Sequence, residues 1–176
     1  LVLDLRPSAT VRATLRMTLA ISAGCAVPPQ GTMAAKLNTT WASPVFIPDL
    51  SLVAELNGRI VGHVVLSKVQ LKSGNRSSEI LALGPMSVVP SQSHRGIGSE
   101  LIEAAVARAK PLCFGAIVVA GHPDYYQRFG FRPAKEWGIT CNLPIPDDAL
   151  SAMEIVTGAL AGGGQVEYPE LFKALF

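Results

Sequence analysis

The chain has 176 residues, near the usual size of one domain, and it is 49% hydrophobic and 16% charged, which excludes a disordered protein. Fifteen Lys and Arg against thirteen Asp and Glu give a net charge of +2 without a long basic run, so we expect no nucleic-acid partner. Three widely spaced cysteines, Cys25, Cys113 and Cys141, predict neither a disulfide framework nor a metal site, and they favour the reducing cytoplasm.

The chain contains no uninterrupted apolar run of the roughly 18 residues that a membrane span needs, so we expect no membrane insertion. Residues 12–25 imitate a lipoprotein signal, because two arginines precede an apolar stretch that ends at Cys25. Thr18 and Ser22 interrupt that stretch, which favours an amphipathic helix that stops at Gly24.

The first 49 residues predict an N-terminal strand followed by helices. Alternating apolar and polar residues indicate a strand over residues 2–6, and apolar residues on one face indicate a helix over residues 9–23. Met33, Leu37 and Trp41 are spaced by four and predict a second, weaker helix over residues 33–41.

From residue 50 the pattern predicts a meander of strands. Residues 52–56 and 60–69 form two strands around Asn57-Gly58, a dipeptide typical of two-residue hairpins because both turn positions need a positive φ. A turn over residues 73–75 leads to a buried strand over residues 79–89. Gly84-Pro85 interrupts that strand, and since proline cannot donate to a ladder, we expect a bulge or a local parting of strands there.

A helix over residues 99–109 and a strand over residues 114–120 complete a βαβ unit, whose two strands are parallel. A short helix over residues 122–128 follows. The remaining expected elements are strands over residues 137–143 and 152–157, a glycine turn over residues 162–164 and a last element over residues 166–176. The order of elements predicts one domain over residues 1–176 of mixed α/β (α+β) class.

Arg95-Gly96-Ile97-Gly98-Ser99 lies between the buried strand and the helix, and it could hold a phosphate. A helix start offers unpaired N–H groups, and glycines let the backbone approach an anion. A dinucleotide fingerprint needs Gly or Ala at the third motif position, where Leu101 stands, and a Walker loop needs a Gly-Lys pair that is absent. A tight turn that binds no ligand stays as an alternative.

Three motifs together resemble the GNAT acyl-CoA N-acyltransferase superfamily. They are Leu83-Gly84-Pro85-Met86-Ser87-Val88-Val89-Pro90, Arg95-Gly96-Ile97-Gly98 and Tyr126-Gln127-Arg128-Phe129-Gly130-Phe131. Gly-His-Pro-x-Tyr-Tyr at residues 121–126 makes the chain most similar to the YhbS-like predicted N-acetyltransferases. The resemblance implies a mixed, mostly antiparallel sheet splayed around one parallel strand pair and flanked by helices, with the coenzyme-binding core in residues 50–176.

The resemblance also implies an activity, namely transfer of an acetyl group from acetyl-CoA to a primary amine by direct attack in a ternary complex. The acceptor is not identified by these motifs, and the chain is expected to act as a monomer or homodimer. The alternative is an acyl-CoA-binding sensor of the same fold without turnover. Ser93 stands where the family usually has Gln or Arg, which favours this alternative slightly, whereas Tyr126 favours the enzyme.

The family pattern assigns two groups to catalysis. The backbone N–H of Met86 stabilises the negative charge on the thioester oxygen, and the phenol of Tyr126 protonates the departing thiolate. The pattern also implies a coenzyme-binding set, in which Val88 pairs with the pantetheine amides. Its members are Met86, Ser87, Val88, Ser93, His94, Arg95, Gly96, Ile97, Gly98 and Ser99.

The acceptor amine arrives as an ammonium ion, so a base must remove its proton. Glu79 and His122 are equal candidates for this base. His63 lies in an apolar strand, where a hydrogen-bonded structural histidine is the more common case. Cys113 and Cys141 lie in apolar strand patterns and are expected to be core thiols.

Overall fold

The computed structural model describes residues 3–4, 10–13 and 44–173, which form two compact units. Unit 1 comprises Leu1–Leu66 and Pro85–Pro111, and unit 2 comprises Ser67–Gly84 and Leu112–Phe176. Strands β4 (Arg59–Ser73) and β5 (Arg76–Val88) each contribute residues to both units. Neither unit is therefore continuous in the sequence.

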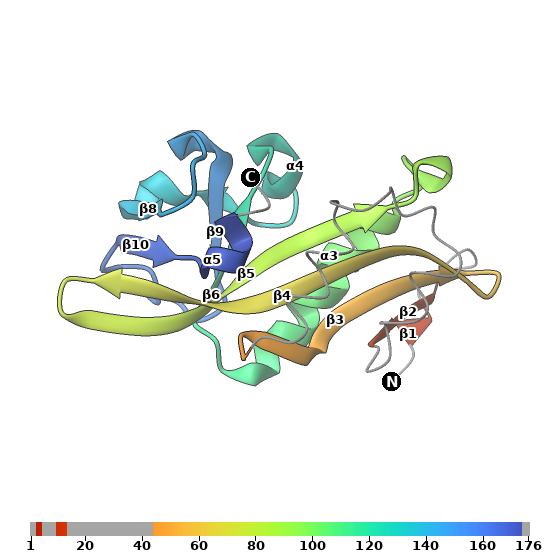
Figure 1. Cartoon of the computed structure of the whole chain (residues 1–176), viewed down its shortest axis with the longest axis horizontal. Coiled ribbons are helices and arrows are strands. Elements are labelled where there is room, and N and C mark those ends of the chain that lie inside the picture. Colours follow the sequence, from red (N-terminus) through yellow and green to blue (C-terminus); the bar gives the residue numbers. More distant parts are fainter. Residues whose placement is uncertain (1–2, 5–9, 14–43, 174–176) are drawn as a thin grey trace. The chain divides into compact units, whose positions relative to one another are not determined.

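Unit 1 is a sheet with one long helix. Its strands β1 (Leu3–Asp4), β2 (Thr10–Ala13) and β3 (Phe46–Leu56) pair antiparallel in that order, and β3 is followed by the first part of β4. Helix α3 (Ile97–Ala109) packs against β2 and β3 (Figure 1). Leu101 and Ile102 of α3 are fully buried, as are Leu50 and Leu52 of β3, because the apolar stripe of the helix meets the apolar face of the sheet.

The hairpin between β3 and β4 is confirmed. Asn57 has φ 51° and Gly58 has φ 74°, so both central residues take the positive φ that this turn requires. Both strands are longer than expected, since β3 begins at Phe46 and β4 continues to Ser73.

The helix predicted over residues 9–23 is wrong at its start, because Thr10–Ala13 is strand β2. β2 pairs with β3 from Thr10↔Glu55 to Ala13↔Leu52. β-branched Thr10 and Val11 suit a strand, and the edge of β3 supplies ladder partners that a helical periodicity does not reveal. Residues 14–23, the signal-like Cys25 and the helix expected over residues 33–41 lie outside the described residues.

Unit 2 contains the rest of the sheet and two short helices. β6 (Ala116–Ala120) lies between β5 and β9 (Leu150–Glu154), and β7 (Arg132–Pro133) pairs with β9. β10 (Gly164–Glu167) pairs antiparallel with β4 and parallel with β8 (Ile139–Cys141). The helices of unit 2 are α4 (Pro123–Gln127) and α5 (Glu170–Lys173). Its 3₁₀ turns are Ala134–Trp137 and Asp147–Ala149. A further 3₁₀ turn lies in unit 1 at Pro90–Gln92, and another, Lys110–Leu112, spans the point in the sequence where unit 1 ends and unit 2 resumes.

The predicted parallel pair is confirmed in unit 2. β5 pairs parallel with β6 from Leu81↔Ile117 to Leu83↔Val119. These pairs end immediately before Gly84, whose φ is 135°, and the boundary between the units on β5 falls between Gly84 and Pro85. The pairing therefore stops at the position where the sequence predicts that the strands part.

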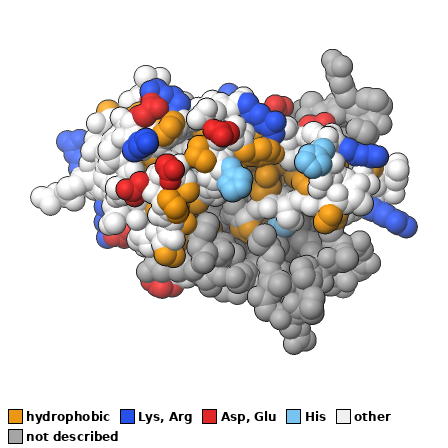
Figure 2. Space-filling model, turned by 90° about the horizontal axis from the view of Figure 1, so that it is seen from above, with side chains coloured by type: hydrophobic (Ala, Val, Ile, Leu, Met, Phe, Trp, Pro, Cys, Tyr) orange, Lys and Arg blue, Asp and Glu red, His pale blue; other side chains and the backbone are white. Residues whose placement is uncertain are grey.

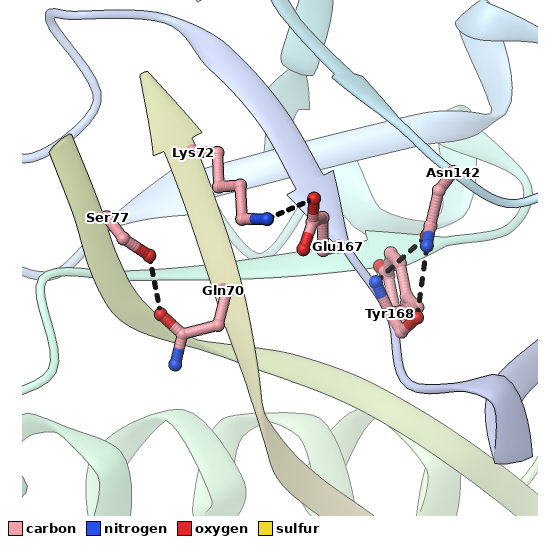
Figure 3. A network of polar contacts seen from close by, with 6 residues as sticks. All are labelled: Gln70, Lys72, Ser77, Asn142, Glu167 and Tyr168. Atoms are coloured by element: carbon pink, nitrogen blue, oxygen red, sulfur yellow. Dashed lines mark hydrogen bonds and ion pairs between the residues drawn. The ribbon is translucent and has the colours of Figure 1, made fainter. Parts of the chain in front are cut away.

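Polar side chains fasten β10 to its neighbours (Figure 3). Lys72 Nζ of β4 lies 2.7 Å from Glu167 Oε1 of β10. Asn142, which follows β8, accepts the Tyr168 N–H at 2.9 Å and donates to the Tyr168 carbonyl at 3.1 Å. The parallel contact of β8 with β10 and the two-residue strand β7 were not predicted, and the strand expected over residues 137–143 is shortened to β8.

Candidate functional site

The start of α3 presents backbone N–H groups to an open space. The first helical hydrogen bond runs from the Glu100 N–H to the Gly96 carbonyl, at 3.0 Å, so the amides of Ile97 and Gly98 have no acceptor within the helix. Gly96, the N-cap, has φ 85° and makes no side-chain cap bond. A Cβ built on Gly96 meets no atom within 4 Å, so an anion can approach this backbone closely.

Exposed polar side chains precede this helix start. Ser93, His94 and Arg95 are all exposed, and the Ser93 N–H donates to the Pro90 carbonyl at 3.1 Å, closing the 3₁₀ turn after β5. The guanidinium of Arg95 adds a positive charge beside the uncapped amides. Unit 1 thus contains the segment Arg95–Ser99, which the sequence predicts could hold a phosphate, directly after Ser93 and His94.

Met86, Ser87 and Val88 form the half-buried end of β5 in the same unit. Ser87 Oγ lies 3.1 Å from Nδ1 of His63 on β4. His63 is only 7% exposed, its Nε2 is buried without a hydrogen-bond partner, and burial lowers its pKa to about 4. His63 is therefore neutral at pH 7. The sequence did not reveal its pairing with Ser87, since that depends on strand register.

Tyr126 belongs to α4 in unit 2 and is half-buried. Its ring makes edge contacts with Tyr125, at 5.2 Å between centroids, and with Phe131, at 5.9 Å. The pKa of the Tyr126 phenol is raised above its usual value of 10, mainly because the phenol is buried and to a lesser extent because Tyr125 lies next to it. The phenol thus keeps its proton at neutral pH and can act as a proton donor.

The two candidate bases occupy different surroundings in unit 2. His122 is exposed and caps α4 in an extended conformation, with φ −70° and ψ 112°. Glu79 Oε1 lies 2.9 Å from Lys68 Nζ, and its side chain is 42% exposed. Glu79 precedes Leu83, the end of the parallel pairing, by four residues, or about 13 Å of strand. The fold therefore places His122 beside the helix of Tyr126 and Glu79 well upstream on β5.

The expectation that both cysteines are core thiols is wrong for Cys113. Cys113 is exposed and has φ 60°, because it lies in the turn after the 3₁₀ helix Lys110–Leu112 and not in β6. Cys141 on β8 is half-buried, and its burial raises the pKa of its thiol. The raised pKa disfavours the thiolate form of Cys141, and so its action as a nucleophile.

Charged side chains of both signs are mixed on the face seen in Figure 2. Within the described ranges, no three His, Cys, Asp or Glu residues are grouped so that they could hold a metal ion. Among the helices that the structure describes, none has the length and apolar character to cross a membrane.

Residues 48–133 match the family model of the acetyltransferase (GNAT) domain. Over these residues, about half of its length, the chain is similar to the GNAT acetyltransferases. Among its curated relatives from Escherichia coli, the uncharacterised N-acetyltransferase YjhQ is 32% identical over 102 residues, which cover 57% of this chain and 56% of YjhQ. The uncharacterised N-acetyltransferase YhbS is 28% identical over 126 residues, which cover 70% of this chain and 74% of YhbS. The chain thus spans little more than half the length of YjhQ.

Solved structures confirm the fold. The crystal structure of YhbS from Escherichia coli in complex with CoA superposes with a TM-score of 0.79 and 22% identity, covering 97% of this chain and 94% of that one. A GNAT family acetyltransferase from Brucella melitensis in complex with acetyl-CoA gives a TM-score of 0.67 and 23% identity, with coverages of 93% and 97%. The mixed sheet flanked by helices is therefore that of the family.

Proposed function

We propose that this protein is an N-acetyltransferase that moves the acetyl group of acetyl-CoA to a primary amine of an acceptor still to be identified, by direct attack in a ternary complex. The observation that carries the proposal is the open, uncapped helix start at Gly96, where the amides of Ile97 and Gly98 can receive a phosphate. The CoA and acetyl-CoA held by the two solved relatives support this choice of ligand.

The residues of unit 1 fit the coenzyme by their chemistry. The exposed residues Ser93–Gly96 and the first turn of α3, up to Ser99, offer amides, hydroxyls and the Arg95 guanidinium to the pyrophosphate. Ser93 replaces a longer side chain of the family, so the backbone donors and Arg95 carry most of this contact. The end of β5, from Met86 to Val88, offers backbone groups for the amides of the pantetheine arm.

The transfer step needs three groups from the chain, and the thioester supplies an activated acetyl group. The Met86 N–H stabilises the charge that develops on the carbonyl oxygen. The Tyr126 phenol, which like any phenol of pKa 10 or above is protonated at neutral pH, donates its proton to the departing thiolate. For the base we propose His122 ahead of Glu79, since Glu79 is held by Lys68 and His122 is exposed next to α4.

The chain is further proposed to work as one domain, as a monomer or homodimer, because β4 and β5 supply residues to both units. Its expected cytoplasmic location remains a prediction.

The proposal is tested in two steps with the full chain. Calorimetry with CoA measures binding, and release of free thiol from acetyl-CoA is then followed with a pooled panel of amines, comprising a polyamine, amino acids, an aminoglycoside and a peptide with a free N-terminus. We expect binding and amine-dependent thiol release. Binding without release from any amine indicates the sensor, and a lack of CoA binding contradicts both functions.

A further inference from the structure

We infer that Gly121 is a positioning residue for the Tyr126 phenol. Because glycine has no side chain, the Tyr126 ring can lie against residue 121, and this fixes where the proposed proton donor lies. The inference rests on the proposed function, because it concerns the group to which that function assigns the leaving-group proton. Gly121 immediately follows β6, and Tyr126 comes from α4 in the same unit.

The ring of Tyr126 lies against the backbone of Gly121. A Cβ built on Gly121 would lie 2.8 Å from Cε2 of Tyr126, 3.5 Å from its hydroxyl oxygen and 3.6 Å from Cζ. Carbon atoms in contact are about 3.5–4.0 Å apart, so even an alanine here overlaps the ring. These three atoms, the nearest to this Cβ apart from those of the adjoining residues, all belong to the side chain of Tyr126.

The backbone of Gly121 is held in place. Its N–H donates to the Ala149 carbonyl at 2.9 Å, and the preceding residue, Ala120, pairs with Leu150 of β9. A methyl group at Gly121 therefore cannot be accommodated by a small movement of this strand end without breaking ladder contacts.

The ring of Tyr126 must move instead, and its freedom to do so is limited. The ring of Tyr125 packs edge-on against it, with an interplanar angle of 89°. The ring of Phe131 also packs against it, with an interplanar angle of 68°. Phe131 is only 1% exposed, so it belongs to the core and does not yield easily. A methyl at residue 121 consequently displaces the ring together with its hydroxyl.

Backbone conformation does not account for the glycine. Gly121 is not among the glycines whose φ lies in the positive region, in contrast to Gly96 and Gly130. An alanine can adopt such a backbone, so the close approach of the Tyr126 ring is the feature that requires glycine at this position.

The test compares Gly121→Ala with Gly115→Ala. Gly115 directly precedes β6, at the end opposite Gly121, and a Cβ there would lie 2.9 Å from the Cβ of Ala159. This control therefore creates a similar overlap at the other end of the strand. The assay uses acetyl-CoA and the amine from the panel described above that gives the fastest thiol release. We expect Gly121→Ala to lower kcat about 10–100-fold, because a displacement of a catalytic group by about 1 Å can cost that much. The KM for acetyl-CoA should change less than about twofold, and Gly115→Ala should keep kcat near the wild-type value.

A double-mutant cycle separates positioning from general packing. In the Tyr126→Phe background no hydroxyl remains to be displaced, so Gly121→Ala should lower kcat by less than about twofold. An equal loss of kcat in both backgrounds overturns the inference, because Gly121 then acts independently of the phenol.

A second readout needs no activity. The chain has three tyrosines, Tyr125, Tyr126 and Tyr168, so 3-fluorotyrosine labelling gives three ¹⁹F signals that Tyr→Phe variants assign. Gly121→Ala should shift the Tyr126 signal and leave the Tyr168 signal unchanged. An unchanged Tyr126 signal overturns the inference and leaves the proposed function standing. A Tyr126→Phe enzyme with full kcat overturns the proposed acid itself, whatever the ¹⁹F spectrum shows.

Discussion

Tyr126 combines a phenol with a setting that keeps it protonated. Replacing it by Phe keeps the ring and its contacts with Tyr125 and Phe131 but removes the proton. We expect kcat to fall about 10²–10⁴-fold, the usual contribution of a general acid, with little change in the affinity for acetyl-CoA. Tyr125→Phe alters the neighbouring ring in the same way and should have a small effect. If Tyr125→Phe is the more damaging change, the acid is Tyr125.

His63 makes the stability of the protein sensitive to acid. Its pKa is about 4 in the fold and 6.5 in the unfolded chain, so between these values the unfolded chain binds more protons. Stability therefore decreases as the pH falls from 6.5 to 4, by about 3 kcal/mol at about 1.4 kcal/mol per unit of pKa difference.

This prediction is checked by urea unfolding at several pH values. His63→Gln keeps a polar partner for Ser87 but does not titrate, so its free energy of unfolding should fall less steeply below pH 6.5 than that of the wild type. His94→Gln, at an exposed position in the same unit, should keep the wild-type slope. Equal slopes for His63→Gln and the wild type would refute the assignment.

At the scale of elements, α3 is expected to bind an anion through its first turn. Gly98→Val places a branched side chain beside the uncapped amides, and the loss of one charge-assisted hydrogen bond should weaken CoA binding about 10–100-fold. Ala107→Val puts the same side chain on an exposed position near the other end of α3 and should bind CoA normally. Calorimetry measures both, and unchanged affinity in Gly98→Val shows that this loop is only a turn.

Elements defined by local chemistry were predictable from the sequence, and those defined by distant partners were not. Asn57-Gly58 specifies its own turn, and Gly84-Pro85 marks the end of the β5–β6 pairing. β2 was not predicted, because this four-residue strand forms through its hydrogen bonds to the edge of β3, a partner that the local sequence does not reveal. β10 was not predicted for the same reason, and neither was its parallel pairing with β8.

The candidate site divides in the same way. The glycines and Arg95 at the start of α3 were visible in the sequence, because a helix start after a strand has its own signature. The ion pair of Glu79 with Lys68 was not visible, since it depends on how β4 and β5 are aligned. The role of Gly121 was also hidden, because it arises from the packing of an α4 side chain on the end of β6.

For the whole molecule, the sharing of β4 and β5 predicts that the two units unfold together. In a Trp41→Phe background, Trp137 fluorescence reports on unit 2. The circular dichroism of helices includes the signal of α3 in unit 1, the longest helix that the structure describes. We expect both probes to give one urea midpoint. Leu101→Ala, which empties a fully buried position of α3 and costs about 2–5 kcal/mol, should lower both midpoints equally. Two distinct midpoints would show independent units.

The interleaving of the units also bears on synthesis of the chain at the ribosome. The meander β3–β4–β5 is complete at Val88, and its turns at residues 57–58 and 74–75 close over short loops, so it can form as soon as it emerges. Its sheet then exposes apolar surface until α3 has emerged at Ala109 and β6 at Ala120. Completion of β9 at Glu154 comes later still. A nascent chain from which β5 has emerged but α3 has not is therefore expected to be the form of this protein that depends most on chaperones.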